Sequence, residues 1–362
     1  MTSGAFPFEA NPNPVDAADR AARLVDPGFG RVFTDHMVTI RYSDAKGWHD
    51  AKVGPRAPLT LDPATAVLHY AQEIFEGLKA YRLADGTMAL FRPEQNARRF
   101  QRSAKRLAMP ELPEEMFLQA CRQLVQVDKD WFPPVDGGSI YLRPFMIASE
   151  VFLGVKPSAE YLFMVIASSA GNYFKSGAPA ISIWVSEQYT RAARGGTGAA
   201  KCGGNYAASL VAQSEAIREG CDQVVFLDAA EHRWVEELGG MNLFFLFDDG
   251  SLLTPPTDGT ILEGITRDSV LTLARAQGLA VREERYAMDQ WRADAESGRL
   301  VEVFACGTAA VITAVGTVKS TQGAFTIGAG GAGQMTQQIR TKLVDIQRGA
   351  AADTHGWVHR ID

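Results

Sequence analysis

Apolar and polar positions alternate along many short stretches of the chain, and each such stretch predicts a β-strand. The predicted strands lie at 38–42, 88–91, 139–147, 161–167, 181–185, 223–227, 242–247, 251–253, about 281–286, 300–305 and 310–318. Helical stretches fall between them without a regular strand–helix–strand order. The pattern therefore predicts an α/β or α+β fold with mixed sheets.

Apolar residues spaced three or four positions apart predict helices at about 94–108, 114–130, 204–219, 266–277 and 335–348. In the first of these, the inward row is Phe100, Ala104 and Leu107, and the outward row is Arg98, Arg102, Lys105 and Arg106. Arg99 borders the inward row. It is the arginine of this helix best placed to reach inward and hold a phosphate.

A segment rich in turn formers, 168–179, separates two apolar strands. It predicts a boundary between a smaller N-terminal domain, 1–170, and a larger C-terminal domain, 171–362. A chain of 362 residues is long enough for two domains with sizeable cores.

Composition narrows the classes of function. With 46% hydrophobic and 22% charged residues the chain is typical of a soluble globular protein. A formal net charge of −6 without a long basic run argues against a nucleic-acid partner, and the apolar runs are too short to cross a membrane. The four scattered cysteines have no metal-binding spacing and are typical of reduced thiols, which predicts a cytoplasmic protein.

Lys201 is flanked by small residues over 195–204, Gly-Gly-Thr-Gly-Ala-Ala-Lys-Cys-Gly-Gly. Glycine lacks a Cβ atom and lets the backbone approach a ligand closely. Removal from water lowers a lysine pKa from about 10.4 and frees the amine to attack an aldehyde. This predicts a Schiff-base lysine for pyridoxal 5′-phosphate (PLP). A solvated lysine in a flexible glycine loop is the alternative.

A PLP site also needs an acid at the pyridine nitrogen. Glu236 and Glu237 lie between apolar residues, and strand alternation sends their side chains to opposite faces. One is expected to point inward and the other to meet water. The alternative is an exposed pair at the end of a strand.

Two further segments suit anions. Thr266 is expected to cap the helix that follows it, with Ser269 three positions on, and the start of such a helix attracts phosphate. The Gly-Thr-Ala turn at 307–309 would present successive backbone N–H groups to a substrate carboxylate. Either segment also occurs without any ligand.

The glycine-rich run 327–333 matches the G-x-G-x-x-G pattern of dinucleotide sites. Such a site needs a following strand with an acid about 20 residues beyond, and no apolar strand is expected after it. A flexible loop is the preferred interpretation.

Five motifs occur in order along the chain: Phe-Glu-Gly-Leu-Lys-Ala at 75–80, Tyr-Leu-Arg-Pro at 141–144, Lys-Cys-Gly-Gly-Asn-Tyr at 201–206, Glu-Leu-Gly-Gly-Met-Asn at 237–242 and Gly-Ile-Thr-Arg at 264–267. Together they resemble the branched-chain amino acid aminotransferases, which are two-domain, fold-type-IV PLP enzymes. The resemblance covers nearly the whole chain.

The resemblance implies roles for matching residues. Lys201 would be the Schiff-base lysine and proton shuttle, and Glu237, not Glu236, would face the pyridine nitrogen. Cofactor contacts are also implied for Arg99, Arg191, Tyr206, Ile265, Thr266 and Thr308.

The implied reaction is reversible, ping-pong transfer of the amino group of leucine, isoleucine or valine to 2-oxoglutarate. The products are branched-chain 2-oxo acids and glutamate. The implied substrate residues are Phe29, Tyr70, Phe75, Tyr141, Arg143, Val155, Tyr173, Thr308 and Ala309. We expect Arg143 and the Tyr141 hydroxyl to bind the glutamate γ-carboxylate. The family also implies a homodimer, in which the loop at 153–155 closes the neighbour's pocket.

The chain departs from mammalian members of the family at two places. Residues 310–313 lack their C-x-x-C pair, and Gly240 replaces a threonine of the pocket. Two rivals remain: a D-amino acid aminotransferase or aminodeoxychorismate lyase of the same fold, and a non-catalytic nucleotide-binding protein built on 327–333.

Overall fold

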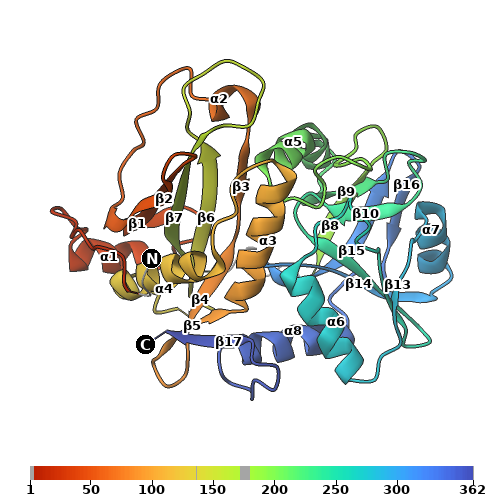
Figure 1. Ribbon diagram of the computed structural model, residues 1–362. Coiled ribbons are helices and arrows are strands. Elements are labelled where there is room, and N and C mark those ends of the chain that lie inside the picture. Colours follow the sequence, from red (N-terminus) through yellow and green to blue (C-terminus); the bar gives the residue numbers. More distant parts are fainter. Residues whose placement is uncertain (1–3, 136, 172–179, 362) are drawn as a thin grey trace. The chain divides into compact units, whose positions relative to one another are not determined.

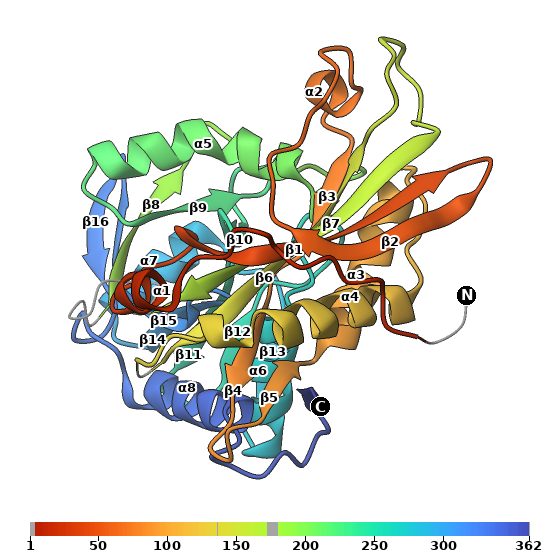
Figure 2. The ribbon, with the colours of Figure 1, turned by 90° about the vertical axis from the view of Figure 1, so that its left-hand side faces the viewer.

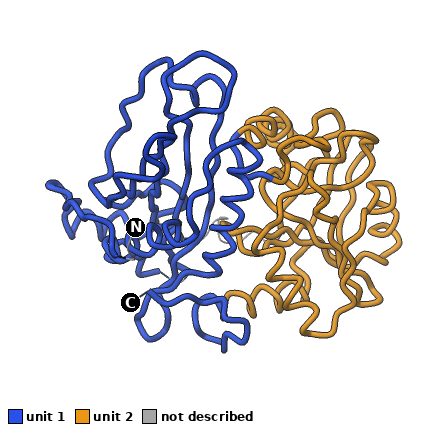
Figure 3. Tube along the Cα trace, viewed as in Figure 1, with its two compact units in different colours: residues 1–173, 200–203, 346–362 blue, residues 174–199, 204–345 orange. Residues whose placement is uncertain are grey.

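The computed structural model describes residues 4–135, 137–171 and 180–361 (Figure 1). The chain forms two compact units, coloured separately in Figure 3. Unit 1 comprises Met1–Tyr173, Ala200–Gly203 and Ile346–Asp362, and unit 2 comprises Phe174–Ala199 and Gly204–Asp345. Part of the predicted boundary segment, 172–179, lies outside the described residues, so the domain limits stay a prediction.

Unit 1 is built on one sheet, seen from a second direction in Figure 2. Its strands are β1 (Val32–Ser43), β2 (Gly47–Pro55), β3 (Glu73–Phe75), β4 (Leu78–Arg82), β5 (Met88–Phe91), β6 (Ser139–Ala148), β7 (Glu160–Ala170) and β17 (Val358–Ile361). Their order is β17-β5-β4-β6-β7-β1-β2, with β3 paired to β6. Each pairing recorded among the described residues of this sheet is antiparallel.

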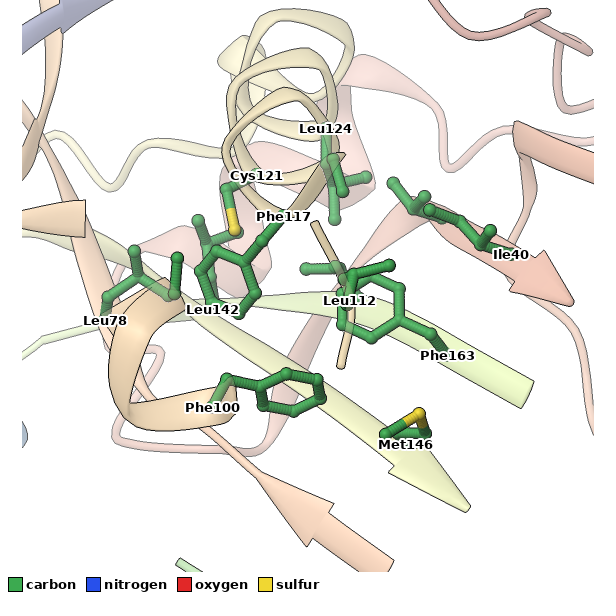
Figure 4. Packing of buried hydrophobic residues seen from close by; sticks show 14 of the residues in the cluster. Ile40, Leu78, Phe100, Leu112, Phe117, Cys121, Leu124, Leu142, Met146 and Phe163 are labelled. Carbon is green, nitrogen blue, oxygen red and sulfur yellow. The ribbon is translucent and has the colours of Figure 1, made fainter. Parts of the chain in front are cut away.

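The core of unit 1 lies between this sheet and two helices (Figure 4). The helices of the unit are α1 (Ala17–Leu24), α2 (Val67–Tyr70), α3 (Pro93–Arg106), α4 (Glu114–Val127) and the 3₁₀ turn η1 (Lys129–Trp131). Phe100 of α3 contacts Phe117 of α4 and Phe163 of β7, with ring centroids 5.6 and 5.5 Å apart. Burial of these rings fixes α3, whose other positions carry candidate site residues.

The sheet of unit 2 is mixed. Its strands are β8 (Ile181–Ser186), β9 (Gln223–Leu227), β10 (Val235–Leu238), β11 (Asn242–Phe247), β12 (Leu252–Thr254), β13 (Val281–Glu283), β14 (Leu300–Gly307), β15 (Val311–Ser320) and β16 (Gly323–Thr326). The order is β10-β9-β8-β15-β14-β11-β12-β13, with β16 paired to β15. Strand β8 runs parallel to both β9 and β15, and β12 runs parallel to β13.

Helices lie on both sides of the sheet of unit 2. They are α5 (Gly203–Arg218), α6 (Ile265–Ala276), α7 (Met288–Glu296) and α8 (Gln334–Gln347), the last belonging to this unit up to Asp345. Figures 1 and 2 both show α5 and α6 on opposite sides of this sheet. The predicted mixed-sheet α/β fold is confirmed.

The longer predicted elements are found close to their expected bounds. Sequence patterns did not predict the strands β2, β3, β4 and β16, or the helices α1, α2 and α7. The expectation that no strand follows 327–333 was wrong, since β17 lies there. However, β17 pairs antiparallel with β5 of unit 1, so it does not complete a parallel strand–helix–strand unit.

Candidate active site

Lys201 is anchored in unit 1 through its backbone. The Lys201 N–H donates to Ser103 Oγ of α3 at 2.9 Å, and its carbonyl accepts the Phe75 N–H at 2.9 Å. Its neighbours Ala200 and Cys202 are buried in the core of unit 1. The lysine is therefore held in a fixed segment, which disfavours the alternative of a flexible loop.

The glycine after this segment is needed for close packing. The Gly203 N–H donates to the Glu73 carboxylate, and a Cβ atom at Gly203 would overlap that carboxylate. The group that approaches this glycine is Glu73 of the same unit, and the close approach of a ligand stays a prediction. Burial raises the pKa of Glu73, while the Gly203 N–H and Arg143 oppose this shift.

Arg99 points inward, as predicted, and forms a buried ion pair with Glu76. Arg98, Arg102, Lys105 and Arg106 are exposed on the outer face of α3. Asn96 adds a hydrogen bond of 2.7 Å to Glu76 Oε2. Burial raises the pKa of the Glu76 carboxyl, but Arg99, Lys201 and Asn96 outweigh it, and the pKa lies below its usual value of 4.5.

Sequence reasoning missed Glu76 as a partner of Arg99. The signal was the 75–80 motif itself, in which a glutamate stands between apolar residues on a short strand connection. Because Glu76 is 0% exposed, its charge must be compensated within unit 1. Arg99 and Asn96 provide that compensation. Glu76 in turn sets the position of the Arg99 side chain.

Four of the predicted substrate residues and Lys201 form one continuous cluster in unit 1. The rings of Phe29 and Tyr141 meet edge to face at 4.8 Å. Arg143 Nη2 donates to the Tyr141 hydroxyl at 2.9 Å, and its guanidinium lies 4.7 Å from the Phe75 ring centroid. The Lys201 Nζ atom lies 4.9 Å from the same centroid.

This cluster combines an amine, a guanidinium and a phenol with aromatic rings. Arg143 Nε is buried and has no hydrogen-bond partner among the described residues. A Cβ atom at Gly77 would overlap the Tyr141 hydroxyl, so glycine is required where Tyr141 reaches the strand connection. The arrangement can bind a carboxylate next to an apolar group.

Two other predicted substrate residues are exposed: Tyr70 at the end of the short helix α2 and Val155 on the loop before β7. Tyr70 is 37% exposed and its hydroxyl donates to the Leu153 carbonyl at 2.6 Å. Val155, two residues beyond Leu153, is 90% exposed. No contact between these residues and the Lys201 cluster is recorded in the described part of the chain. Tyr173 lies outside the described residues.

In unit 2, Glu237 is buried on the edge strand β10, and its carboxylate accepts hydrogen bonds from several donors. Arg191 Nη2 lies 2.5 Å from Oε1, which also accepts the Leu262 N–H at 2.9 Å. Asn242 Nδ2 donates to Oε2 at 3.3 Å. Sequence reasoning named Glu237 and Arg191 but missed Leu262 and Asn242. The asparagine closes the 237–242 motif, and that placement was the available signal.

The expectation that one of the two adjacent glutamates meets water is wrong. Glu236 is 6% exposed and Glu237 is 2% exposed. The 258–262 loop covers both, because Thr260 Oγ1 donates to Glu236 Oε1 at 2.6 Å while Leu262 binds Glu237. Burial raises the pKa of Glu236, the Thr260 hydrogen bond opposes this shift, and the Glu237 charge adds to it.

The N-cap of α6 lies two residues before the predicted one. Gly264 takes the N-cap position with no side-chain cap, the helix begins at Ile265, and Thr266 is its second residue. Thr266 is therefore not the cap. Ser269 Oγ donates to the Ile265 carbonyl at 2.9 Å and is not a capping partner either. The first N–H groups of α6 lack a side-chain cap, as an anion site requires.

The remaining predicted cofactor residues also lie in unit 2. Thr308 and Ala309 form the turn between β14 and β15 and are half-buried. Tyr206 is half-buried near the start of α5, and a Cβ atom at Gly240 would lie 3.6 Å from its ring. Gly240 therefore leaves room beside Tyr206 for a small side chain.

The four cysteines are buried and reduced. Burial raises the pKa of Cys306 to about 12, which supports a packing role for this thiol. No group of metal-ligating side chains is found in the part of the chain that the structure describes. Among the same residues, no helix is long and apolar enough to cross a membrane.

A family model and the sequences of known proteins assign the chain to the same family. Residues 73–318 match the model of the class IV aminotransferases. The chain is 58% identical over 362 residues to a probable branched-chain-amino-acid aminotransferase of Streptomyces coelicolor, covering 100% of both chains.

Solved structures agree. Branched-chain amino acid aminotransferase from Escherichia coli superposes with a TM-score of 0.73 at 29% identity, covering 91% of this chain and 99% of that one. The branched-chain amino acid aminotransferase from Thermobaculum terrenum, in its PLP form, gives 0.70 at 26% identity, covering 89% and 98%. With a matching family model and a relative that aligns from end to end, this protein belongs to the class IV aminotransferases, within the fold-type-IV branched-chain amino acid aminotransferase family.

Proposed function

We propose that this protein transfers the amino group of leucine, isoleucine or valine to 2-oxoglutarate, with PLP as its cofactor. The observation that carries the proposal is the buried Glu237 carboxylate with Arg191 beside it. A buried carboxylate with such partners suits a site that must hold a protonated pyridine nitrogen. The class of the family and the PLP form of the Thermobaculum terrenum relative support the same cofactor.

The residues of this chain fit PLP by their chemistry. Arg191 Nη1 is buried and has no hydrogen-bond partner among the described residues, so it offers a donor to a further acceptor. We propose that the phosphate binds at the start of α6, at Ile265 and Thr266, where the dipole of the helix favours an anion. We propose that Arg99 and Thr308 also hold the phosphate, and that Tyr206 bonds the 3-oxygen of the ring.

When bound, PLP supplies an aldehyde that condenses with amines and a ring that takes up electrons from the substrate. Lys201 Nζ would be the amine that holds this aldehyde and, once the substrate amine has displaced it, the base that moves the proton from the substrate Cα. The Glu237 carboxylate would face the ring nitrogen, and Arg191 and Asn242 hold that carboxylate in place. The N–H groups of the Thr308–Ala309 turn receive the substrate α-carboxylate.

One pocket must accept both an aliphatic side chain and the glutamate side chain, because a ping-pong enzyme binds its two amino acids in turn. We propose that Phe29, Phe75 and Tyr141 contact the aliphatic chain, with burial worth about 25 cal/mol per Å². Arg143 Nε and the Tyr141 hydroxyl bind the γ-carboxylate of glutamate. The unpartnered Arg143 Nε supports this role.

We further propose a cytoplasmic homodimer. Leu153 is 64% exposed and Val155 is 90% exposed, on the loop that the family places against a neighbouring subunit. Exposed apolar side chains gathered on one loop are typical of interaction surfaces. This loop and Tyr70 would then complete the pocket of the partner subunit.

A coupled assay over the proteinogenic amino acids, with 2-oxoglutarate as acceptor, tests the proposal. We expect glutamate formation with leucine, isoleucine and valine, and parallel lines in double-reciprocal plots. Activity restricted to D-amino acids, or none with any amino acid, would overturn it. Intersecting lines would reject the ping-pong order alone.

A further inference from the structure

Unit 2 contains a cavity of about 460 Å³ that the proposed reaction does not use. It lies beside β10, and Glu236, Trp234 and Thr260 are among the residues that line it. Its volume is in the range of small-molecule sites, roughly 300–1,000 Å³. Glu237, the neighbour of Glu236 on β10, is not among the lining residues.

The lining carries two unsatisfied polar atoms of opposite character. Glu236 Oε2 is buried without a hydrogen-bond partner, whereas its Oε1 accepts the Thr260 hydroxyl. The Trp234 Nε1 group is a buried donor that also lacks a partner among the described residues. Because unsatisfied buried polar atoms are rare and costly, these two atoms point to a ligand with both a donor and an acceptor.

The remaining charged groups of the cavity lining limit the choice of ligand further. Asp228 is satisfied by backbone N–H groups, including those of Glu231 and Trp234 at 2.8 Å each. Asp258 is paired with Arg285 at 3.3 Å. Arg194 is exposed, and no ion pair is recorded for it among the residues that the structure describes. Glu231 is exposed at the rim. Glu236 is therefore the buried carboxylate of the lining, and Arg194 its arginine, for which no ion pair is recorded among the described residues.

We propose that this cavity is a second binding site, distinct from the Lys201 and Glu237 residues, for a free α-amino acid. The ammonium group pairs with Glu236, and the carboxylate is bound by Arg194 and the Trp234 indole N–H. Pro255, Pro256 and Ile261 supply the apolar part of the lining for the side chain. A zwitterion satisfies both polar atoms at once, which neither an amine nor a carboxylate alone does.

The test uses L-proline as the probe, because its secondary amine cannot be transaminated. Holoenzyme is titrated by calorimetry with L-proline, with pyrrolidine, which lacks the carboxylate, and with cyclopentanecarboxylate, which lacks the amine. We expect measurable binding of L-proline and at least about tenfold weaker binding of the other two. Binding of either half as tight as that of L-proline would overturn the zwitterion assignment.

Binding measurements on variants test whether L-proline binds in this cavity. Glu236→Gln keeps the shape of the side chain and removes its charge, and should weaken L-proline binding at least about tenfold. Arg194→Gln lies on the surface, leaves folding intact, and should also weaken it. Glu231→Gln removes an exposed carboxylate from the rim of the same cavity and should change binding less than about twofold. Equal affinity in wild type, Glu236→Gln and Arg194→Gln would overturn the proposal. Thermal unfolding of each variant shows that it is folded.

Discussion

Arg99 donates two hydrogen bonds to the Glu76 carboxylate, from Nε to Oε1 at 2.7 Å and from Nη2 to Oε2 at 2.8 Å. Both side chains are buried, and they lie 23 residues apart in the chain. The pair ties the short connection after β3 to helix α3. The same helix carries Ser103, which holds the backbone of Lys201. The Arg99–Glu76 pair is thus part of the framework that positions the lysine.

Removing one partner of this buried pair should destabilise unit 1. We expect Glu76→Gln to lower the free energy of unfolding by about 3 kcal/mol, because Arg99 is left buried without its counter-charge. Urea unfolding followed by circular dichroism measures the change. Glu114→Gln is the matched control, since it breaks a solvent-accessible pair between Glu114 of α4 and Arg98 of α3 and should cost less than about 1 kcal/mol. Equal losses in the two variants would contradict this account.

The cost of Glu76→Gln should depend on pH. The folded-state pKa of Glu76 lies below its unfolded value, so its contribution to stability is fully present above about pH 4.5. It is lost as the pH falls through the lower, folded-state pKa. The stability difference between wild type and Glu76→Gln should therefore be constant from pH 6 to 8 and shrink below pH 4.5. A difference that grows on acidification would reject the charged pair.

The contribution of Glu236 to stability should depend on pH in the opposite direction to that of Glu76. Its folded-state pKa is raised by burial, so the favourable state is the protonated one, and its stability contribution is lost as the pH rises through the folded-state pKa. At pH 8 we expect Glu236→Gln to unfold at a higher temperature than wild type in the absence of added amino acids. At pH 4 the two should be nearly equal. A lower unfolding temperature for Glu236→Gln at pH 8 would show that the charge of Glu236 is already compensated.

Arg143 should separate the two classes of substrate. We expect Arg143→Ala to lower kcat/KM for glutamate by about 10- to 100-fold, since a charge-assisted hydrogen bond to the γ-carboxylate is lost. The value for leucine should fall less than about fivefold. Tyr141→Phe should show the same preference to a smaller degree. Equal losses for both amino acids would assign Arg143 a purely structural role, through its contacts with Phe75 and Tyr141.

Local sequence patterns predicted the helices and strands that have one face on the core and the other face in water. The 94–108 helix was recognisable because Phe100 and Ala104 face the core while Arg98 and Arg102 face water, and this pattern also placed Arg99 inward. Lys201 was singled out by its small neighbours, and its catalytic role stays a prediction. The helix pattern is local in sequence, and the structure preserves it.

Features that depend on distant segments were not predictable. Nothing near Arg99 indicates that Glu76 is its partner, because the pair forms only when β3 and α3 pack together. The burial of both Glu236 and Glu237 was missed because strand alternation assumes water on one face. Here the 258–262 loop covers β10 and supplies the Thr260 and Leu262 donors. The N-cap of α6 was misplaced by two residues because Gly264, and not Thr266, takes that position without a side-chain bond.

Borohydride reduction of the PLP-loaded protein, followed by mass analysis of its peptides, tests the central claim most directly. The account predicts a phosphopyridoxyl group on Lys201 alone, and no such adduct in Lys201→Ala after the same treatment. Lys79, a buried lysine of unit 1, is the internal control and should stay unmodified. A stable adduct on Lys79 or any other lysine, with Lys201 unmodified, would contradict the assignment.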